Sequence, residues 1–385
     1  MSQQPKSPRI VIAGGGTGGH VLPAIAVIEE LQRRNQQAVL LWIGSAGGLE
    51  AEQAQLKNVP FKSIRTGKLR RYLDLKTIPD AVRIPVGGVQ AWRLLRSFKP
   101  DVVFSTGGFV SVPTVFAGSR MAPVITHEQT AILGLANRIN ARFADVIAVS
   151  FKDTIDQFKL SPDKAVWTGN PVRGSLLHGD AAHARTVFDL IPGLPLLFVT
   201  GGARGATTLN SRIEANLPDL LQRCQVIHQT GPTSANDDYR RLTEVRAALP
   251  GGLQSRYHVR EFVQDELADV YAAATLVVCR SGAGMVAELA LLGKPSILIP
   301  LPGSGGGEQV LNAKVLERLH GAVVLDQESA TSERLLSEID GLLEAPDKLA
   351  IMGSQAFKAA SPDAVSRLTD LVLDMAAGNK VWFRV

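Results

Sequence analysis

Short runs of apolar, mostly β-branched residues alternate along this chain with longer stretches in which apolar residues recur every three or four positions. The runs predict buried strands and the longer stretches predict amphipathic helices. In the first half the predicted strands are 10–13, 39–43, 102–104 and 124–126, and in the second half they are 196–200, 225–228, 276–279, 296–299 and 322–325. Continuous apolar strands between helices indicate parallel sheets covered on both faces.

The strand-helix pattern begins twice, which predicts two α/β domains. A chain of 385 residues is too long for one ordinary core. The segment 10–13 and the segment 196–200 are each followed by a glycine-rich turn and a helix, which is a weak repeat of domain size. We therefore predict two Rossmann-like, doubly wound domains at 1–170 and 171–355 that face one cleft, with a closing helix near 362–376 that packs back on the first domain.

Composition narrows the class of protein. With 45% hydrophobic and 20% charged residues, the sequence is that of a globular protein. The net charge of +5 suits phosphate ligands or an anionic membrane surface and is too small to indicate nucleic-acid binding. Cys224 and Cys279 are the only cysteines, and we expect buried thiols rather than a disulfide. No apolar signal core or membrane span is evident, so we expect a cytoplasmic protein.

Two glycine-rich turns, at 14–20 and 201–206, each link a predicted strand to a predicted helix. The free amides and the positive end of such a helix form a cradle for an anionic or sugar-bearing ligand. Gly14, Gly16 and Gly19 also fit the dinucleotide fingerprint, which expects an acid at the end of the second strand. The first carboxylate there is Glu50, beyond the strand, which disfavours a dehydrogenase. A P-loop is excluded because no Gly-Lys-Ser/Thr follows either turn.

Two further junctions carry polar residues at predicted helix starts. Ser-Gly-Ala-Gly at 281–284 follows an apolar strand and could take a pyrophosphate, and Glu288 in the next turns could accept from both ribose hydroxyls. A helix-dipole role for Glu288 explains the residue equally well. The run 303–307 opens another helix, on which Gln309 and Asn312 share one face. Their amides suit sugar hydroxyls, or serve only as caps.

Five motifs occur in order between about residues 10 and 325, and together they are far more specific than any one alone. They are Gly-Gly-Thr-Gly-Gly-His at 15–20, Gly-Gly-Phe-Val-Ser at 107–111, His-Glu-Gln at 127–129, Gly-Asn-Pro-Val-Arg at 169–173, and Cys-Arg-Ser-Gly-Ala at 279–283 followed by Glu288. This set resembles the MurG-type glycosyltransferases. The resemblance implies the GT-B fold and the transfer of N-acetylglucosamine from UDP-N-acetylglucosamine to lipid I, giving lipid II and UDP in peptidoglycan biosynthesis.

The resemblance also implies which residues bind each substrate. For UDP-N-acetylglucosamine these are Thr17, Gly18, Gly19, Thr130, Arg173, Ala203, Val263, Ala283, Gly284, Met285, Val286, Ala287, Glu288 and Gln309. Glu288 would hold the ribose hydroxyls and Gln309 the sugar. On the acceptor side they are Gly15, Gly16, Gly107, Gly108, His127 and Glu128, with His127 and Glu128 shaping the pocket.

The chemistry implied is an inverting transfer, in which the 4-hydroxyl of N-acetylmuramic acid attacks the anomeric carbon. His20 is the best candidate for the base because histidine titrates near neutral pH. The alternative is that His20 only supports its loop or binds acceptor phosphate. No Asp-x-Asp sequence occurs, so we expect no metal site and no cofactor, and helix-end amides stabilise the leaving pyrophosphate instead. Two other functions stay open: another GT-B transferase acting on a glycolipid, and a non-catalytic nucleotide-sugar-binding relative.

Three positions depart from the family pattern. Thr130 stands where many relatives carry Asn, which removes one hydrogen bond to the donor sugar. Ala203 stands where Ser is common, so only a backbone amide remains there. The loop before Gln309 is unusually rich in glycine.

Cationic and large apolar residues interleave in three stretches between residues 64 and 100. These stretches are 68–73, 82–86 and 92–96. The pattern suits an interfacial surface near anionic lipid headgroups, as expected for an enzyme with a polyprenyl-linked acceptor. We therefore expect a protein that is peripheral on the cytoplasmic face of the cell membrane, although an ordinary amphipathic helix with a basic outer face fits the pattern equally well.

Overall fold

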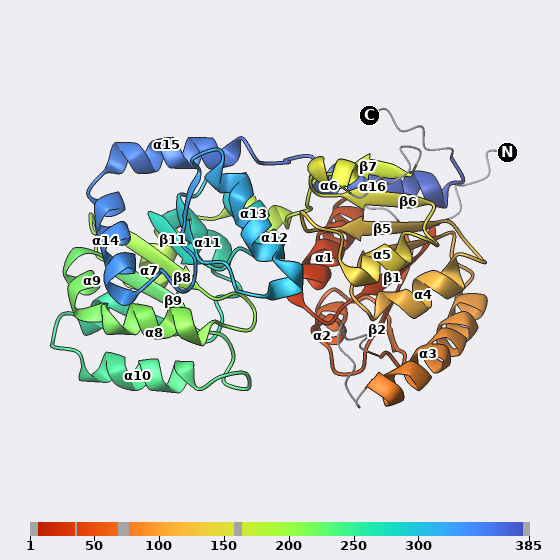
Figure 1. The fold of residues 1–385 in the computed structure, drawn as a ribbon, viewed down its shortest axis with the longest axis horizontal. Coiled ribbons are helices and arrows are strands. Elements are labelled where there is room, and N and C mark those ends of the chain that lie inside the picture. Colours follow the sequence, from red (N-terminus) through yellow and green to blue (C-terminus); the bar gives the residue numbers. More distant parts are fainter. Residues whose placement is uncertain (1–6, 35–36, 68–76, 158–163, 380–385) are drawn as a thin grey trace. The chain divides into compact units, whose positions relative to one another are not determined.

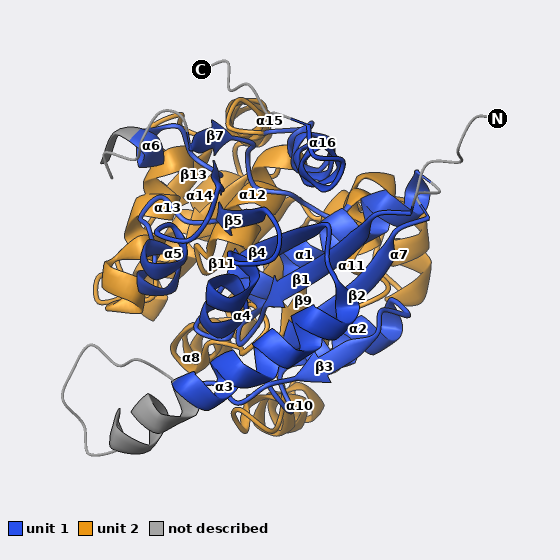
Figure 2. Ribbon diagram, turned by 90° about the vertical axis from the view of Figure 1, so that its right-hand side faces the viewer, with its two compact units in different colours: residues 1–173, 361–385 blue, residues 174–360 orange. Residues whose placement is uncertain are grey.

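The computed structural model describes residues 7–34, 37–67, 77–157 and 164–379. The chain divides into two compact units (Figures 1 and 2). Unit 1 comprises Met1–Arg173 and Ser361–Val385, and unit 2 comprises Gly174–Ala360. Each unit contains one parallel sheet with helices on both faces, so the predicted α/β, Rossmann-like fold class is confirmed.

Unit 1 is built on a seven-stranded sheet with the strand order β3-β2-β1-β4-β5-β6-β7. Its strands are β1 (Arg9–Gly14), β2 (Val39–Gly44), β3 (Phe61–Ser63), β4 (Val102–Gly107), β5 (Val124–Glu128), β6 (Val146–Val149) and β7 (Ala165–Trp167). Its helices are α1 (Gly18–Arg33), α2 (Leu49–Leu56), α3 (Thr77–Phe98), α4 (Ser111–Gly118), α5 (Leu135–Asn140), α6 (Asp153–Gln157) and α16 (Ala364–Ala376).

Alternate residues of the central strands of unit 1 face opposite layers of helices. Ile10 and Ile12 of β1 belong to the cluster that includes α1 and α16. Val11 and Ala13 belong to the cluster that includes α3 and α4. All four side chains are fully buried. Because successive side chains of a strand point to opposite faces, a continuous apolar run is what a sheet covered on both sides requires.

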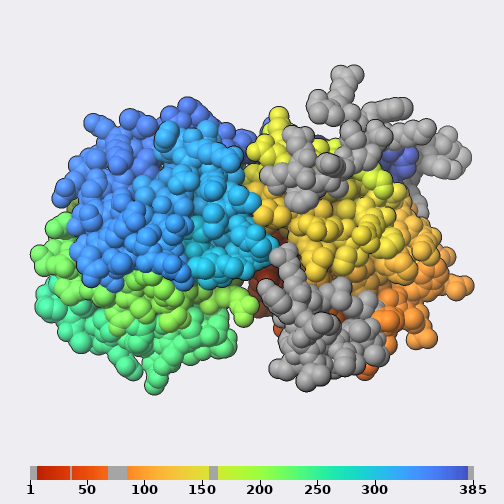
Figure 3. Space-filling model, viewed as in Figure 1, coloured from red at the N-terminus to blue at the C-terminus, as the bar shows by residue number. Residues whose placement is uncertain are grey.

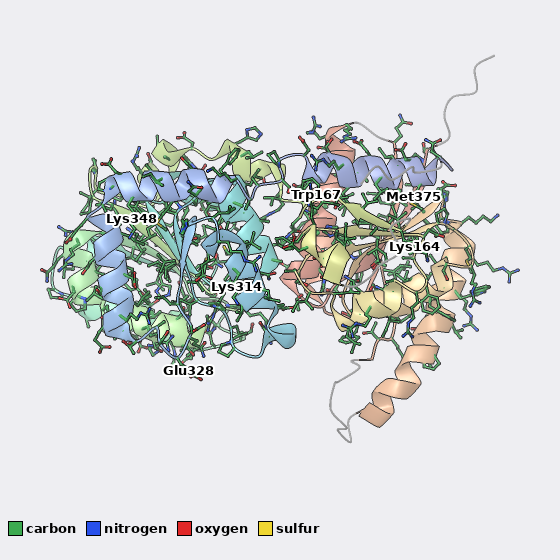
Figure 4. All side chains as sticks on the ribbon, turned by 45° about the horizontal axis from the view of Figure 1, so that its top comes forward. Lys164, Trp167, Lys314, Glu328, Lys348 and Met375 are labelled. Atoms are coloured by element: carbon green, nitrogen blue, oxygen red, sulfur yellow. The ribbon has the colours of Figure 1, made fainter. Side chains whose placement is uncertain are left out.

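Helix α16 packs against α1 and β4 of unit 1 although about 190 residues separate it from the rest of that unit. At its surface Arg34 forms an ion pair with Asp370 and donates to the Ser366 hydroxyl at 2.7 Å. Trp167, labelled in Figure 4, contacts the Arg367 guanidinium at 4.8 Å from its ring centre. Leu368 and Val372 are fully buried, so hydrophobic burial holds this helix on unit 1 and polar contacts fix its rotation.

Unit 2 is built on a six-stranded sheet with the strand order β10-β9-β8-β11-β12-β13. Its strands are β8 (Leu196–Thr200), β9 (Gln225–Gln229), β10 (Tyr257–Arg260), β11 (Leu276–Cys279), β12 (Ser296–Leu298) and β13 (Ala322–Val324). Its helices are α7 (Ala181–Val187), α8 (Thr207–Ala215), α9 (Leu217–Arg223), α10 (Asp238–Ala248), α11 (Leu267–Ala273), α12 (Ala283–Leu291), α13 (Glu308–Glu317), α14 (Ser332–Leu343) and α15 (Pro346–Phe357), with short 3₁₀ turns at η1 (Gly174–His178), η2 (Gln254–Arg256) and η3 (Ser304–Gly306).

Every predicted strand is present, and the structure adds β3, β6, β7 and β10. All four have three or four residues and lie at or next to a sheet edge, where a short run carries little periodic signal. Cys224 and Cys279 are buried free thiols, as predicted. In the part of the chain that the structure describes, no helix is long and apolar enough to cross a membrane. Residues 68–73 lie outside the described residues.

Candidate active site

Each parallel sheet has one pair of neighbouring strands from which the chain connections run toward opposite edges of the sheet. α/β proteins bind ligands at this point, at the carboxyl ends of the strands. In unit 1 this place lies between β1 and β4, and in unit 2 between β8 and β11. The glycine turns that follow β1 and β8 therefore lie at the ligand-binding edges of their sheets. Residues 107–108 after β4 and 280–282 after β11 complete the two edges.

The first glycine turn, residues 14–17, is held by a buried carboxylate. Glu50 on α2 is fully buried, and its Oε2 accepts from the Gly16 amide at 3.0 Å. Its Oε1 accepts from the Ser45 amide at 2.9 Å and from the Ser45 hydroxyl at 2.5 Å. The turn then leads into α1, where the amides of His20 and Val21 donate to the Thr17 carbonyl oxygen. No sequence motif indicates that Glu50 belongs to this turn.

His20 lies in the first turn of α1 and is only partly buried. Its Nδ1 lies 2.9 Å from the Thr106 carbonyl oxygen and 3.2 Å from Gln129 Oε1. Both neighbours are acceptors, so Nδ1 carries the proton of the neutral ring. The Nε2 atom is then the unprotonated nitrogen, which is the form that a general base needs.

The second turn of unit 1, Gly107 and Gly108, packs directly on the first. Both residues have positive φ angles, of +90° and +79°. A Cβ on Gly108 would lie 2.6 Å from the Gly15 carbonyl oxygen and 3.1 Å from the His20 ring. A Cβ on Gly107 would lie 2.8 Å from the side-chain amide of Asn137. The close approach of the two turns therefore requires glycine at position 108, and the contact with Asn137 of α5 requires it at position 107.

Glu128 ends β5 and organises the loop that follows it. The side chain is 2% exposed and accepts from the Thr130 amide at 3.0 Å, the Gly134 amide at 2.9 Å and the Asn137 side-chain amide at 3.0 Å. The Thr130 hydroxyl lies 2.8 Å from the same carboxylate. The structure thus places both Glu128 and Thr130 in contacts within unit 1 that shape this loop.

His127 is fully buried beneath the same edge of the sheet. Its Nε2 lies 3.1 Å from the Gly169 carbonyl oxygen and its Nδ1 lies 3.1 Å from the side-chain amide of Gln129. Burial lowers the pKa of His127 to about 4, so the ring is neutral at pH 7. These contacts make His127 a support for Gln129, which in turn contacts His20.

In unit 2, the contacts recorded among the described residues hold the glycine turn at 201–206 through neutral groups. The Gly202 amide donates to the Thr200 hydroxyl at 3.0 Å, and Gln229 Nε2 donates to the same hydroxyl oxygen at 3.1 Å. The other end of the Gln229 amide accepts from the Val263 amide at 3.0 Å. Gln229, which sequence reasoning missed, therefore ties the glycine turn to the loop that carries Val263. Ala203 at the tip of this turn is exposed.

Glu288 is 6% exposed on the second turn of α12. The hydroxyl of Tyr271, a buried residue of α11, donates to Glu288 Oε2 at 2.9 Å. Among the predicted residues of this helix, Ala283 and Val286 are buried, whereas Gly284, Met285 and Ala287 are half-buried. Tyr271 fixes the orientation of the carboxylate, a role that no sequence motif had indicated.

The start of α13 is tied to the start of α12 through Ser281. The Ser281 hydroxyl donates to the Gln309 carbonyl oxygen at 2.8 Å, and the Asn312 side-chain amide donates to the Ser281 carbonyl oxygen at 3.2 Å. Gln309 Oε1 accepts from the Leu301 amide at 2.9 Å, which leaves its NH₂ group as the donor for a ligand. Asn312 is fully buried and acts as a structural link.

The predicted site residues thus fall into two clusters, one in each unit. Unit 1 holds Gly15, Gly16, Thr17, Gly18, Gly19, His20, Gly107, Gly108, His127, Glu128 and Thr130, and Arg173 is the last residue of its first segment. Unit 2 holds Ala203, Val263, the 283–288 helix start and Gln309. Among the described residues, no group of three or more His, Cys, Asp or Glu side chains could hold a metal ion.

Two Rossmann-like units, each with a glycine turn at the ligand-binding edge of its sheet, define the architecture of a GT-B glycosyltransferase. The chain matches the glycosyltransferase family 28 N-terminal domain over residues 10–149 and the family 28 C-terminal domain over residues 196–368. In fold it is similar to the crystal structure of MurG from Acinetobacter baumannii, with a TM-score of 0.71 and 26% identity over 95% of this chain and 99% of that one.

Curated relatives identify the family. The chain is 36% identical to the UDP-N-acetylglucosamine–N-acetylmuramyl-(pentapeptide) pyrophosphoryl-undecaprenol N-acetylglucosamine transferase of Listeria monocytogenes, over 95% of this chain and 99% of that protein. It is 34% identical to the enzyme of the same name from Halalkalibacterium halodurans, over 96% and 99% of the two chains. The chain belongs to this family and is a glycosyltransferase.

Proposed function

We propose that this protein transfers N-acetylglucosamine from UDP-N-acetylglucosamine to the 4-hydroxyl of the N-acetylmuramic acid of lipid I, with inversion, giving lipid II and UDP. The relatives named above support both substrates, because their names state a UDP-linked donor and a pyrophosphoryl-undecaprenol acceptor. The observation in the structure that carries the proposal is the buried carboxylate of Glu288 in the second turn of α12, which accepts a hydrogen bond from the Tyr271 hydroxyl.

The donor binds unit 2. The amides at the start of α12 take the pyrophosphate, because the N–H groups of a first helical turn point along the axis at the positive end of the helix. Glu288 accepts hydrogen bonds from the two ribose hydroxyls, and the NH₂ group of Gln309 binds the sugar. Arg173, Ala203, Val263 and the half-buried side of α12 contribute further contacts, with Gln229 fixing the distance between Ala203 and Val263 along the edge of the sheet.

The acceptor binds unit 1, where His20 acts as the base. As the acceptor oxygen attacks the anomeric carbon from the face opposite UDP, its proton passes to His20 Nε2 and the electron pair of the C–O bond leaves with UDP. The Thr106 carbonyl oxygen and Gln129 stabilise the ring once both nitrogens carry protons. The helix-end amides stabilise the charge on the departing pyrophosphate.

A UDP-release assay with a lipid I analogue tests this function. We expect UDP release that requires both substrates, and its loss in His20→Ala and Glu288→Ala variants. UDP release that is unchanged when lipid I is replaced by another glycolipid points to a different GT-B transferase. Full biological activity of the His20→Ala variant points to a non-catalytic, nucleotide-sugar-binding protein. Either result contradicts the proposal.

Unit 1 also has a surface suited to an anionic membrane, which we call the α3–α4 patch. It comprises the exposed apolar side chains of Val86, Val89, Trp92 and Phe116 together with the exposed Arg93, Arg96 and Arg120. Helices α3 and α4 contact each other and pack on the same core cluster. The part of the chain that carries the patch is orange in Figure 3. The Arg120 guanidinium lies 5.1 Å from the centre of the Phe116 ring, so cationic and apolar groups adjoin.

Interleaved arginines and large apolar groups are typical of interfacial binding, and a peripheral position on the cytoplasmic face of the membrane would bring unit 1 to its polyprenyl-linked acceptor. Flotation with anionic liposomes tests the patch. We expect a Trp92→Ala, Arg96→Gln variant to lose binding, whereas Ile351→Ala, which alters an exposed apolar residue of α15, should float like the wild type. Failure of the wild type to float at low salt contradicts the membrane proposal.

A further inference from the structure

We infer that Glu50 is a positioning residue for the acceptor end of the reaction: it fixes the first glycine turn and decides which amides of that turn remain for the acceptor's pyrophosphate. This inference rests on the proposed function, because it assigns a task in binding the lipid-linked acceptor. Glu50 lies outside the five motifs, and its position in the sequence suggested only the acid of a dinucleotide site, beyond the expected strand end.

The contacts of Glu50 show that it serves the turn and is not available to a ligand. Its two carboxylate oxygens accept from three donors, namely the Gly16 amide, the Ser45 amide and the Ser45 hydroxyl. The side chain is fully buried, so no ribose or other ligand hydroxyl reaches it. The carboxylate therefore joins the carboxyl end of β2 to the turn that follows β1, directly ahead of His20.

Three glycines make room for this side chain. A Cβ on Gly15 would lie 2.2 Å from the Glu50 carboxyl carbon, and a Cβ on Gly48 would lie 2.4 Å from Oε2. A Cβ on Gly44 would lie 2.6 Å from the Glu50 Cγ. Such distances are below any real contact of a Cβ atom. The glycines at these positions are thus explained by the space that Glu50 needs, in addition to any need of the backbone for a left-handed conformation.

The negative charge of Glu50 also makes the amides of the turn differ in their ability to bind an anion. Its Oε2 already occupies the Gly16 amide, and a second anion at that point would meet a like charge with no intervening solvent. Among the described residues, the structure records no hydrogen bond from the Gly18 or Gly19 amide, and these groups lie at the positive end of α1. The acceptor's pyrophosphate is therefore directed to the Gly18–Gly19 side, next to His20, and away from Gly15 and Gly16. The family resemblance implied the reverse, with Gly15 and Gly16 on the acceptor side and Gly18 and Gly19 on the donor side, so this placement is part of the inference.

Steady-state kinetics of Glu50→Gln test this role. The substitution keeps the shape of the side chain but turns an NH₂ group toward a backbone or hydroxyl donor, so the turn loses one of its anchors. We expect kcat/KM for the lipid I analogue to fall by about 10-fold or more, while KM for UDP-N-acetylglucosamine changes by less than about two-fold. Glu52→Gln, an exposed neighbour on α2, is the matched control and should behave as the wild type.

A double-mutant cycle provides a second test, which does not require the Glu50→Gln variant to fold. Gly48 has an ordinary φ of −82°, so Gly48→Ala strains no backbone and acts only by taking space from Oε2. We expect Gly48→Ala to reduce kcat/KM for the acceptor as Glu50→Gln does, yet to add less than about two-fold in a Glu50→Ala background, where that space is empty. Independent, multiplicative effects would overturn the inference, as would wild-type acceptor kinetics in Glu50→Gln.

The experiments distinguish a failure of the Glu50 inference from a failure of the proposed function. If the wild type releases no UDP with lipid I, the proposed function fails, and the inference, which rests on it, fails with it. If the wild type is active and a folded Glu50→Gln protein loses affinity for UDP instead of for the acceptor, the function stands and the role of Glu50 is wrong.

Discussion

The two glycine turns occupy equivalent places in two sheets of the same topology, yet they are held in different ways. In unit 1, the buried carboxylate of Glu50 accepts from the Gly16 amide. In unit 2, the Thr200 hydroxyl accepts from the Gly202 amide, and the neutral Gln229 links the turn to Val263. One turn thus contains a fixed negative charge and the other contains none.

This difference teaches that a strand, a glycine turn and a helix do not by themselves make an anion site. The positive end of a helix favours an anion only where no nearby carboxylate already compensates it. In unit 2 no carboxylate contacts the described part of the second turn, so the positive end of α8 is not compensated in this way, whereas the pyrophosphate site that we propose lies at the start of α12. In unit 1, the negative charge of Glu50 offsets part of the positive potential at the start of α1. We assign the catalytic histidine and the acceptor to this unit.

Of the substitutions that distinguish the two units, His20→Ala should lower activity most, because it removes the base from the acceptor side and leaves the donor side intact. We expect kcat to fall by a factor of about 10²–10⁴. The change is measured in the UDP-release assay at saturating concentrations of both substrates. His178→Ala, at an exposed position of η1, is the matched control. If the only change is a higher KM for the donor, His20 acts in donor binding and not as the base on the acceptor side.

Glu288→Gln should have the next largest effect, confined to the donor. A neutral amide accepts more weakly than a carboxylate, and Tyr271 then competes for its single oxygen. We expect kcat/KM for UDP-N-acetylglucosamine to fall by a factor of about 100, which corresponds to about 3 kcal/mol. Glu317→Gln at an exposed position of α13 serves as control. Unchanged donor kinetics in a folded variant would refute the ribose role.

The two units should also differ in their stability at acidic pH. Burial lowers the pKa of His127 in unit 1 to about 4, and of His228 and His258 in unit 2 to about 3 and about 4. Because these folded-state values lie below the unfolded value of 6.5, each ring contributes stability that is complete above pH 6.5 and is lost as the pH falls toward 4. At pH 5 the loss is about 2 kcal/mol for each histidine, so unit 2 should lose more than unit 1.

Urea unfolding at pH 7 and pH 5 measures this difference. The tryptophans of the described residues, at 42, 92 and 167, belong to unit 1, so their emission follows unit 1 while circular dichroism follows both units. We expect the transition seen only by circular dichroism to move further on acidification. A larger shift in the tryptophan transition would contradict the larger contribution assigned to His228 and His258 of unit 2.

Tyr271→Phe should have the smallest effect, because it removes one hydrogen bond and leaves the Glu288 charge in place. We expect KM for the donor to rise by about five-fold with kcat unchanged, as the loss of about 1 kcal/mol predicts. Tyr239→Phe, on the outer helix α10, is the control. An equal effect of both substitutions would show that Tyr271 acts on the stability of the unit and not on the carboxylate.

Much of the fold could be predicted from the sequence, because the central strands are long apolar runs and the turns between them carry diagnostic glycines. The short strands β3, β6, β7 and β10 were not predicted, because three or four residues at or near a sheet edge show no clear periodicity of apolar positions.

The candidate site was predictable only where its residues lie within one motif. His20, Glu128 and Glu288 stand in or next to sequence runs that indicate a ligand site. Glu50 and Tyr271 lie in ordinary helices, and their roles follow from partners 34 and 17 positions away. Gln229 likewise contacts Val263 across 34 positions. Such pairings depend on which strands become neighbours, and local patterns do not contain that information.

Calorimetric titration of UDP into the wild type, His20→Ala and Glu288→Gln tests the central claim, that unit 2 binds the donor and unit 1 serves the acceptor, most directly. We predict that His20→Ala binds UDP within about two-fold of the wild type, whereas Glu288→Gln binds it at least about 10-fold more weakly. Weaker UDP binding in His20→Ala, together with unchanged binding in Glu288→Gln, would contradict the account.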